Sequence, residues 1–224
     1  MKVQRAGRMV KFKEIEKLVK DKSQDTVLVA VSKTKPIELI EEAYDDGARV
    51  FGENRVQELV AKFSENKKED MKIYLIGQLQ SNKVKKAVMY ADRIESVDSI
   101  ALLDKINTEA GKINKKMEIL LEVNSSNEEQ KSGFKTREEV LSAVRYAFAL
   151  KNINLVGLMT VGPLGGDEEK NRKAFLYTKD IFDEISKTHP LSVLSMGMSG
   201  DWETAIECGS TEVRIGTAIF GGRS

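Results

Sequence analysis

The sequence predicts an α/β protein, a closed (β/α)8 barrel of the TIM type with an extra helix at its N-terminal end. Three observations support this prediction. Short apolar runs typical of buried strands alternate with helical patterns along the chain. Eight such runs can be counted, and 224 residues suit one domain, which we expect to span residues 1–224. Such alternation indicates a parallel sheet, and eight strand–helix units favour its closure into a barrel.

A doubly wound open sheet is the alternative to a barrel. It would leave eight strands with two unpaired edges, and no Gly-x-Gly-x-x-Gly pattern follows the first strand. Only seven helices fit between the eight strands, and the apolar spacing within residues 12–19 predicts one more helix ahead of them. We expect this N-terminal helix to cover the remaining gap in the ring.

The first strand is predicted at Val27–Val31, where five apolar residues follow one another. The other seven strands are predicted at Arg49–Gly52, Lys72–Gly77, Asp92–Val97, Met117–Val123, Asn154–Thr160, Leu191–Met196 and Glu212–Ile215.

The helices between them are predicted from apolar residues spaced three or four apart. Asp98 or Ser99 is expected to cap the helix that Gly111 ends, and Thr136 with Glu139 forms a capping box. The apolar stripes lie within residues 37–44, 56–63, 84–88, 102–106, 140–148, 174–185 and 201–208.

The composition argues against a nucleic-acid-binding, a membrane-spanning or a secreted protein. Lys and Arg number 36 against 35 Asp and Glu, a formal net charge of +1 that gives no reason to expect nucleic acid or an anionic membrane as partner. No apolar stretch approaches the roughly 20 residues of a membrane span. Residues 1–10 are basic and lack the apolar segment of a secretory signal, so we interpret them as a frayed extension and expect a cytoplasmic protein.

One cysteine and one histidine exclude several kinds of site. Cys208 alone can form neither an intramolecular disulfide nor a multi-cysteine metal site, and its apolar neighbours favour a buried thiol. His189 precedes Pro190 between two elements, so we interpret it as a solvated loop residue.

Lys33 follows the first strand, at the carboxyl end where barrels carry their chemistry. A surface amine is one interpretation. The other is a lysine partly desolvated in the barrel mouth, which can lose its proton and attack an aldehyde.

The last two strand exits carry small residues that favour phosphate. Ser199 lies in a glycine-rich turn after the seventh strand, and Gly216 and Thr217 follow the eighth. Backbone N–H groups in such turns, with a hydroxyl beside them, form an anion nest, although these glycines can also serve only to shape turns.

Arg214 lies inside the last strand, where a charged side chain is costly unless it is paired or faces a ligand. Outward pairing with a helix carboxylate is the alternative to an inward guanidinium that donates to a ring nitrogen. Lysine, arginine and nest together predict one ligand with an aldehyde, a ring nitrogen and a phosphate. That ligand is pyridoxal 5′-phosphate (PLP).

Six segments carry a resemblance that spans about residues 9–222. They are Ala30–Pro36, Phe51–Glu58, Ile76–Lys83, Gly157–Thr160, Ser195–Asp201 and Arg214–Gly221. In these segments the sequence resembles the pyridoxal phosphate homeostasis protein family, single-domain barrels related to the N-terminal domain of alanine racemase. The family often reads Trp-His-Phe-Ile-Gly where this chain reads Ile73–Gly77, which leaves no histidine there.

The resemblance implies a role for each candidate residue. Lys33 would hold PLP as an internal aldimine, Arg214 would face the pyridine nitrogen, and Asn54 would lie beside the cofactor. The phosphate would be held by Ser199, Gly216 and Thr217.

We expect a PLP-binding protein of intracellular vitamin B6 homeostasis rather than an enzyme. An arginine at the ring nitrogen weakens the electron sink that PLP enzymes use, and racemisation needs a second base. Tyr74 is a conceivable second base, but its place on the third strand favours a packing role or a position beside the ring. A PLP-dependent amino-acid racemase is the first alternative, and a Schiff-base aldolase without PLP is the second. Expected partners are B6 vitamers and apo PLP-dependent enzymes, and the chain is expected to be a monomer or weak dimer.

Two further groups of lysines are secondary candidates. Lys83, Lys85 and Lys86 form a basic cluster that is a solvated face, a weaker phosphate-ligand site or a docking surface. Lys131, in the loop after the fifth strand, is a candidate second amine for aldehydes at the mouth.

Overall fold

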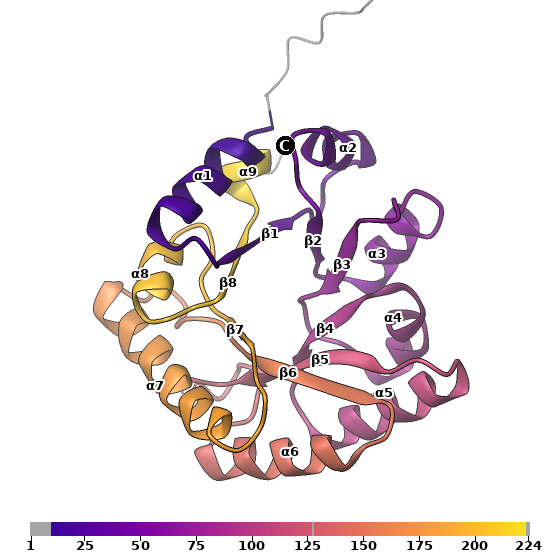
Figure 1. Cartoon of the computed structure of the whole chain (residues 1–224), viewed down its shortest axis with the longest axis vertical. Helices are drawn as coiled ribbons and strands as arrows, with labels where there is room; N and C mark the ends of the chain where they lie inside the picture. The colour runs from indigo at the N-terminus through magenta and orange to yellow at the C-terminus, as the bar shows by residue number, and fades with distance from the viewer. Residues whose placement is uncertain (1–9, 127, 223–224) are drawn as a thin grey trace, which may run out of the picture.

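The computed structural model describes residues 10–126 and 128–222, and its eight parallel strands close into one barrel with helices outside them (Figure 1). The order around the barrel follows the sequence, and β1 pairs with β8, with Val29 opposite Arg214. The predicted barrel is therefore confirmed, and the open sheet is wrong. The strands are β1 (Val27–Val31), β2 (Val50–Glu53), β3 (Lys72–Leu75), β4 (Arg93–Val97), β5 (Met117–Val123), β6 (Ile153–Thr160), β7 (Val193–Ser195) and β8 (Glu212–Ile215).

The helices form the outer ring. Of the predicted extension at residues 1–10, residues 1–9 lie outside the described residues, and Val10 is buried in the core rather than frayed. The short helix α9 has no counterpart among the predicted elements, because four residues are too few to show an apolar repeat. The helices are α1 (Phe12–Lys22), α2 (Ile37–Asp45), α3 (Val56–Phe63), the 3₁₀ turn η1 (Ser81–Lys83), α4 (Val84–Tyr90), α5 (Ile100–Lys112), α6 (Arg137–Ala149), α7 (Glu168–Ser186), α8 (Trp202–Glu207) and α9 (Thr217–Phe220). None of the helices in these ranges is long and apolar enough to cross a membrane.

Helix α1 closes the ring as expected. It packs against β1, α8 and α9, and Figure 1 shows it beside α9 at the junction of the two chain ends. Its buried side chains Phe12 and Val19 join the core. The gap between α8 and α2 is thereby covered by a segment that precedes the first strand.

Helix boundaries show one confirmed cap and two corrections. The capping box is present, since Glu139 N–H donates to Thr136 Oγ1 at 3.1 Å. Ser99 occupies the N-cap of α5 but its hydroxyl donates to Asp98 instead of capping the helix. Gly111 lies inside α5 rather than ending it, and Asn114 adopts the positive φ of 52° that lets the chain leave.

Three strands are shorter than predicted, namely β4 by one residue at its start, β3 by two at its end, and β7 at both ends. β3 ends at Leu75, and Gly77 then packs against Asn54 so closely that a Cβ would lie 2.3 Å from the Asn54 carbonyl oxygen. β7 spans only Val193–Ser195, and Gly197, two residues later, has a φ of 95°, where the chain leaves the extended conformation.

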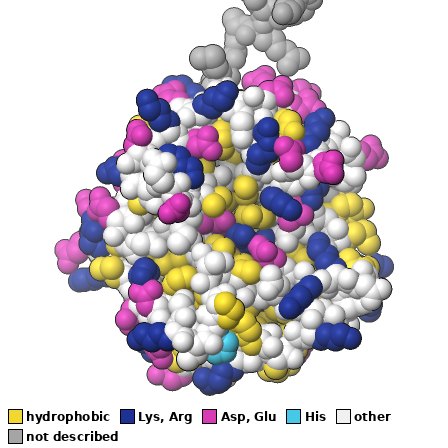
Figure 2. Space-filling model, in the orientation of Figure 1, with side chains coloured by type: hydrophobic (Ala, Val, Ile, Leu, Met, Phe, Trp, Pro, Cys, Tyr) yellow, Lys and Arg dark blue, Asp and Glu magenta, His cyan; other side chains and the backbone are white. Residues whose placement is uncertain are grey.

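The core has an apolar layer between barrel and helices, with large buried side chains such as Phe51, Leu59 and Phe175. The barrel interior is different, because it holds charged side chains. Arg93, Glu95, Glu122, Glu212 and Arg214 are all buried. On the face shown in Figure 2, charges of both signs are interspersed, as the balanced composition predicts.

Gly157→Ala should be strongly destabilising. Gly157 lies opposite Val193 in the β6–β7 pair, and a Cβ there would lie 1.7 Å from the Val193 carbonyl oxygen. The strands would have to separate, and overpacking of this kind costs about 3 kcal/mol. Gly222→Ala is the matched control, since a Cβ at Gly222 would meet no atom within 4 Å. Equal denaturant midpoints for the two variants would contradict this expectation.

Candidate functional site

A cavity of about 440 Å³ opens at the carboxyl ends of the strands. Its volume lies within the range of roughly 300–1,000 Å³ that is usual for small-ligand sites. All six predicted site residues line it, namely Lys33, Asn54, Ser199, Arg214, Gly216 and Thr217. The structure therefore brings together, from four strand exits, residues that lie up to 184 positions apart in the sequence (217 minus 33).

Lys33 lies in the turn after β1 and is half-buried. Among the described residues, its amine has no hydrogen-bond or ion-pair partner. The other lysine that lines the cavity, Lys35, donates from Nζ to the carbonyl oxygens of Gly221 and Gly222 at 3.0 and 2.8 Å. Lys33 is therefore the amine of the cavity wall that is free to react.

Arg214 reaches into the barrel from β8 and is 4% exposed. Its guanidinium donates to Ser195 Oγ at 2.5 Å and to the Thr160 carbonyl at 2.8 Å. A guanidinium has five N–H donors, so these two bonds leave three for a ligand. The alternative of an outward arginine paired with a helix carboxylate is wrong, because β8 directs this side chain into the barrel.

The loops after β7 and β8 contribute backbone N–H groups to the cavity wall. Within the described part of the chain, the backbone N–H groups of Ser199, Gly200 and Thr217 have no hydrogen-bond partner. A Cβ on Gly200 would meet no atom within 4 Å, so open space lies beside that turn. Gly216 packs on β1, where a Cβ would lie 2.9 Å from the Val31 carbonyl oxygen. Free N–H groups beside an open cavity suit a phosphate.

Asn54 follows β2 and also lines the cavity. Its backbone is held by the close packing of Gly77 described above. The sequence patterns missed several other residues of the wall, including Ile76, Val161 and Met198. They are apolar residues just beyond strand ends, so an alternating in-and-out pattern could have identified them only with exact strand boundaries.

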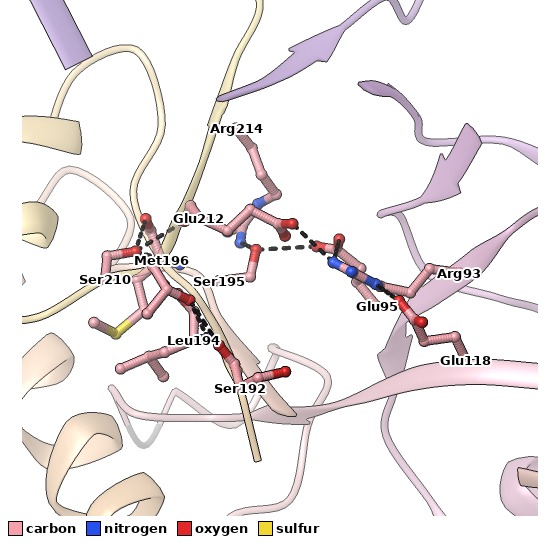
Figure 3. Close-up of polar contacts among 11 residues, drawn as sticks. Arg93, Glu95, Glu118, Ser192, Leu194, Ser195, Met196, Ser210, Glu212 and Arg214 are labelled. Carbon is pink, nitrogen blue, oxygen red and sulfur yellow. Dashed lines mark hydrogen bonds and ion pairs between the residues drawn. The ribbon is translucent and has the colours of Figure 1, made fainter. Parts of the chain in front are cut away.

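Below Arg214 lies a charged network in the barrel interior (Figure 3). Ser195, which accepts from Arg214, donates to Glu95 Oε2 at 3.0 Å. Arg93 donates to Glu212 Oε2 at 2.7 Å and to Glu118 Oε1 at 2.6 Å. The network links the ligand cavity to the opposite end of the barrel.

Burial raises the pKa of two side chains in this part of the barrel, Glu95 and Tyr74. Complete burial, followed by the nearby Glu212 carboxylate, raises the pKa of Glu95 well above its ordinary value. Burial also raises the pKa of the Tyr74 hydroxyl, whose ring lies 4.1 Å from the Arg93 guanidinium carbon. Tyr74 does not line the cavity, so the residue considered as a second base instead packs against Arg93 within the described structure.

Glu95→Gln should flatten the pH dependence of stability. Because the folded pKa of Glu95 is raised above 4.5, the folded state keeps a proton that the unfolded state releases. Stability is therefore lost as the pH rises from about 4.5 towards the folded pKa, by up to about 1.4 kcal/mol per pH unit for one proton. Denaturant unfolding between pH 5 and 8 should show a shallower fall for Glu95→Gln than for wild type. The exposed Glu169→Gln is the control, and equal slopes for all three proteins would contradict the expectation.

The secondary candidates lie outside the cavity wall. Lys131 donates from Nζ to the Gly162 carbonyl at 2.7 Å and pairs with Glu128 at 3.0 Å, so it joins two loops rather than presenting a free amine. Lys83 is half-buried, whereas Lys85 and Lys86 are exposed.

The single cysteine and the single histidine are each at least partly buried. Cys208 is buried, as predicted. His189 is half-buried, with its ring 4.4 Å from that of Phe148, so its interpretation as a solvated residue is corrected.

Comparison with known proteins identifies the family. Residues 12–224 match the family described as alanine racemase, N-terminal domain. A pyridoxal phosphate homeostasis protein from Aquifex aeolicus is 41% identical over 198 residues, which cover 88% of this chain and 86% of the relative. The chain belongs to the pyridoxal phosphate homeostasis protein family. The human pyridoxal phosphate homeostasis protein is 39% identical over 209 residues, covering 88% of this chain and 76% of the relative.

A solved structure within this family matches both fold and sequence. PipY of Synechococcus elongatus PCC7942, in a structure with PLP bound, superposes with a TM-score of 0.86 at 34% identity, covering 94% of this chain and 99% of PipY. The resemblance to the pyridoxal phosphate homeostasis family is thus confirmed over nearly the whole chain.

Proposed function

We propose that this chain binds PLP at the cavity described above and serves in PLP homeostasis. The observation that carries the proposal is the meeting, in one cavity, of the free Lys33 amine, the Arg214 guanidinium and the N–H nest at Ser199, Gly200 and Thr217. These groups match an aldehyde, a ring nitrogen and a phosphate, and the relatives named for PLP homeostasis share the sequence.

Each group of residues would contact a different part of the cofactor. Lys33 would hold the aldehyde through its amine, with the aldehyde oxygen leaving as water, the nest would hold the phosphate, and Arg214 would lie at the ring nitrogen. Bound PLP supplies an electrophilic aldehyde carbon and an electron-withdrawing ring. A guanidinium that donates an N–H to the ring nitrogen would leave that nitrogen unprotonated and so would limit electron withdrawal. Asn54 contributes a polar side chain beside Lys33.

Borohydride trapping tests the proposal. The protein is incubated with PLP, reduced, digested and mapped by mass spectrometry. We expect a visible absorption band before reduction and a pyridoxyl label on Lys33 alone. A colourless protein without any label at saturating PLP would overturn the proposal and would favour a carbonyl-lyase barrel.

Several finer statements belong to the same proposal. They are reversible binding of other B6 vitamers, delivery of PLP to apo PLP-dependent enzymes, a monomer or weak dimer, and a cytoplasmic location. Transfer is tested by mixing the PLP-loaded protein with an apo-aminotransferase and following its activation against free PLP of equal concentration. Turnover across a panel of amino acids, lost on removal of Lys33, would instead favour the racemase alternative.

A further inference from the structure

The residue after Lys33 has an unusual backbone conformation. Thr34 has a φ of 61°, in the left-handed region that β-branched residues rarely adopt. Among the described residues, Asn114 is the one other non-glycine residue with positive φ, and asparagine tolerates that conformation better. A threonine in this conformation persists only when its surroundings hold it there.

Helix α3 supplies the contacts that hold this turn. The Thr34 N–H donates to Glu58 Oε2 at 2.7 Å. One residue before Lys33, the Ser32 carbonyl accepts from Lys62 Nζ at 2.9 Å. Lys33 therefore lies between two residues that are each bonded to the same helix.

The ammonium of Lys62 is fully used in these contacts. Besides Ser32, it donates to Glu53 Oε1 at 2.8 Å and to Glu58 Oε2 at 3.1 Å, which accounts for its three N–H groups. Ser32 Oγ also donates to Glu53 Oε1, at 2.7 Å. We call Ser32, Glu53, Glu58 and Lys62 the Lys62 cluster. Its Lys62 and Glu53 side chains are 13% and 0% exposed, so little solvent competes with the contact between them, whereas the Thr34–Glu58 hydrogen bond is exposed.

A second tether acts from the other side of the turn. Lys35 Nζ donates to the carbonyl oxygens of Gly221 and Gly222, just after α9. The turn that carries Lys33 is therefore fixed between α3 on one side and the end of the chain on the other. Glu58 and Lys62 themselves do not line the cavity within the described structure, so they reach a ligand only through this turn.

We infer that the Lys62 cluster is a positioning device, which holds the left-handed turn at Thr34 so that the Lys33 amine faces the cavity. Glu58 fixes the strained residue directly, and Lys62 fixes the carbonyl that precedes Lys33. The inference rests on the proposed function of Lys33 and assigns positioning roles to Glu58 and Lys62.

The test separates the covalent link from the rest of the binding site. PLP reports on both, whereas 4′-deoxypyridoxine 5′-phosphate has no aldehyde and reports only on ring and phosphate contacts. Glu58→Ala should lower PLP affinity about tenfold, which corresponds to 1.4 kcal/mol, and change affinity for the deoxy analogue less than about twofold. Adding Thr34→Gly should restore PLP affinity, because glycine adopts positive φ without strain.

A control variant and a ligand-free measurement complete the design. Glu38→Ala removes an exposed glutamate from the first turn of α2 and should leave both affinities unchanged. In the ligand-free protein, amide hydrogen exchange at Thr34 should be faster in Glu58→Ala than in wild type, since its acceptor is gone.

Two results would overturn the inference while leaving the proposed function intact. One is a Glu58→Ala protein that binds PLP as wild type does. The other is an equal loss for PLP and the deoxy analogue without rescue by Thr34→Gly, which would indicate a general structural role. A wild-type protein that forms no covalent link with PLP would overturn the proposed function itself, so the two failures are distinguishable.

Discussion

Lys33→Ala should abolish the covalent link to PLP while leaving the fold intact. The Lys33 side chain makes no polar contact among the described residues, so its removal should change the free energy of unfolding by less than about 0.5 kcal/mol. The cavity would keep Arg214 and the proposed phosphate nest, which we expect to hold PLP without a covalent bond. We expect the visible band of the link to disappear completely and borohydride to leave no label.

Lys131→Ala is the matched control for this loss. Lys131 also lies in a loop at the carboxyl end of a strand, but its ammonium is already bonded to the Gly162 carbonyl and to Glu128. This variant should keep both the band and the label. If Lys33→Ala retained a full band while Lys131→Ala lost it, the assignment of the reactive amine would be wrong.

Arg93→Met should produce the largest loss of stability among the charged residues. The Arg93 side chain is 9% exposed and donates to Glu118 and Glu212, with Glu95 at 3.5 Å. Removing it leaves the buried Glu212 carboxylate without the cation that it is hydrogen-bonded to. Breaking a buried ion pair from one side costs about 3–5 kcal/mol, which a denaturant melt at pH 7 would measure.

Two comparisons make this expectation specific. Arg137→Met removes an arginine that pairs with Asp180 and Glu184 on the outer surface, and should cost no more than about 1 kcal/mol. The double variant Arg93→Met/Glu212→Gln should recover part of the loss, because it removes one of the buried charges. Similar losses for Arg93→Met and Arg137→Met would show that burial does not set the cost.

Local patterns predicted most of the barrel. The run Val27–Val31 is the observed β1, and the capping box at Thr136 starts α6 as expected. Errors occurred where a contact distant in sequence decides the boundary. Gly111 resembles a helix stop, yet it packs against Asn152, where a Cβ would lie 2.8 Å from the side-chain nitrogen, and α5 continues past it.

In the candidate site, too, some residues could be predicted from the sequence and others could not. Lys33, Asn54, Ser199, Arg214, Gly216 and Thr217 were predicted because strand exits are recognisable from the sequence and parallel strands bring their exits to one end. Glu95, Ser195 and the Lys62 cluster were missed. Arg93 with Glu95, and Glu212 with Arg214, alternate on inward positions of β4 and β8, and this spacing was the one available signal.

By itself, the sequence determined the alternation of strands and helices, the residues at the strand exits and the ligand chemistry that those residues match. Tertiary structure alone decided which charges meet inside the barrel, which lysine is free, and how Thr34 is held. The physical reason is distance along the chain. Arg93 and Glu212 are 119 residues apart, and their contact exists only after β8 pairs with β1 and the barrel closes.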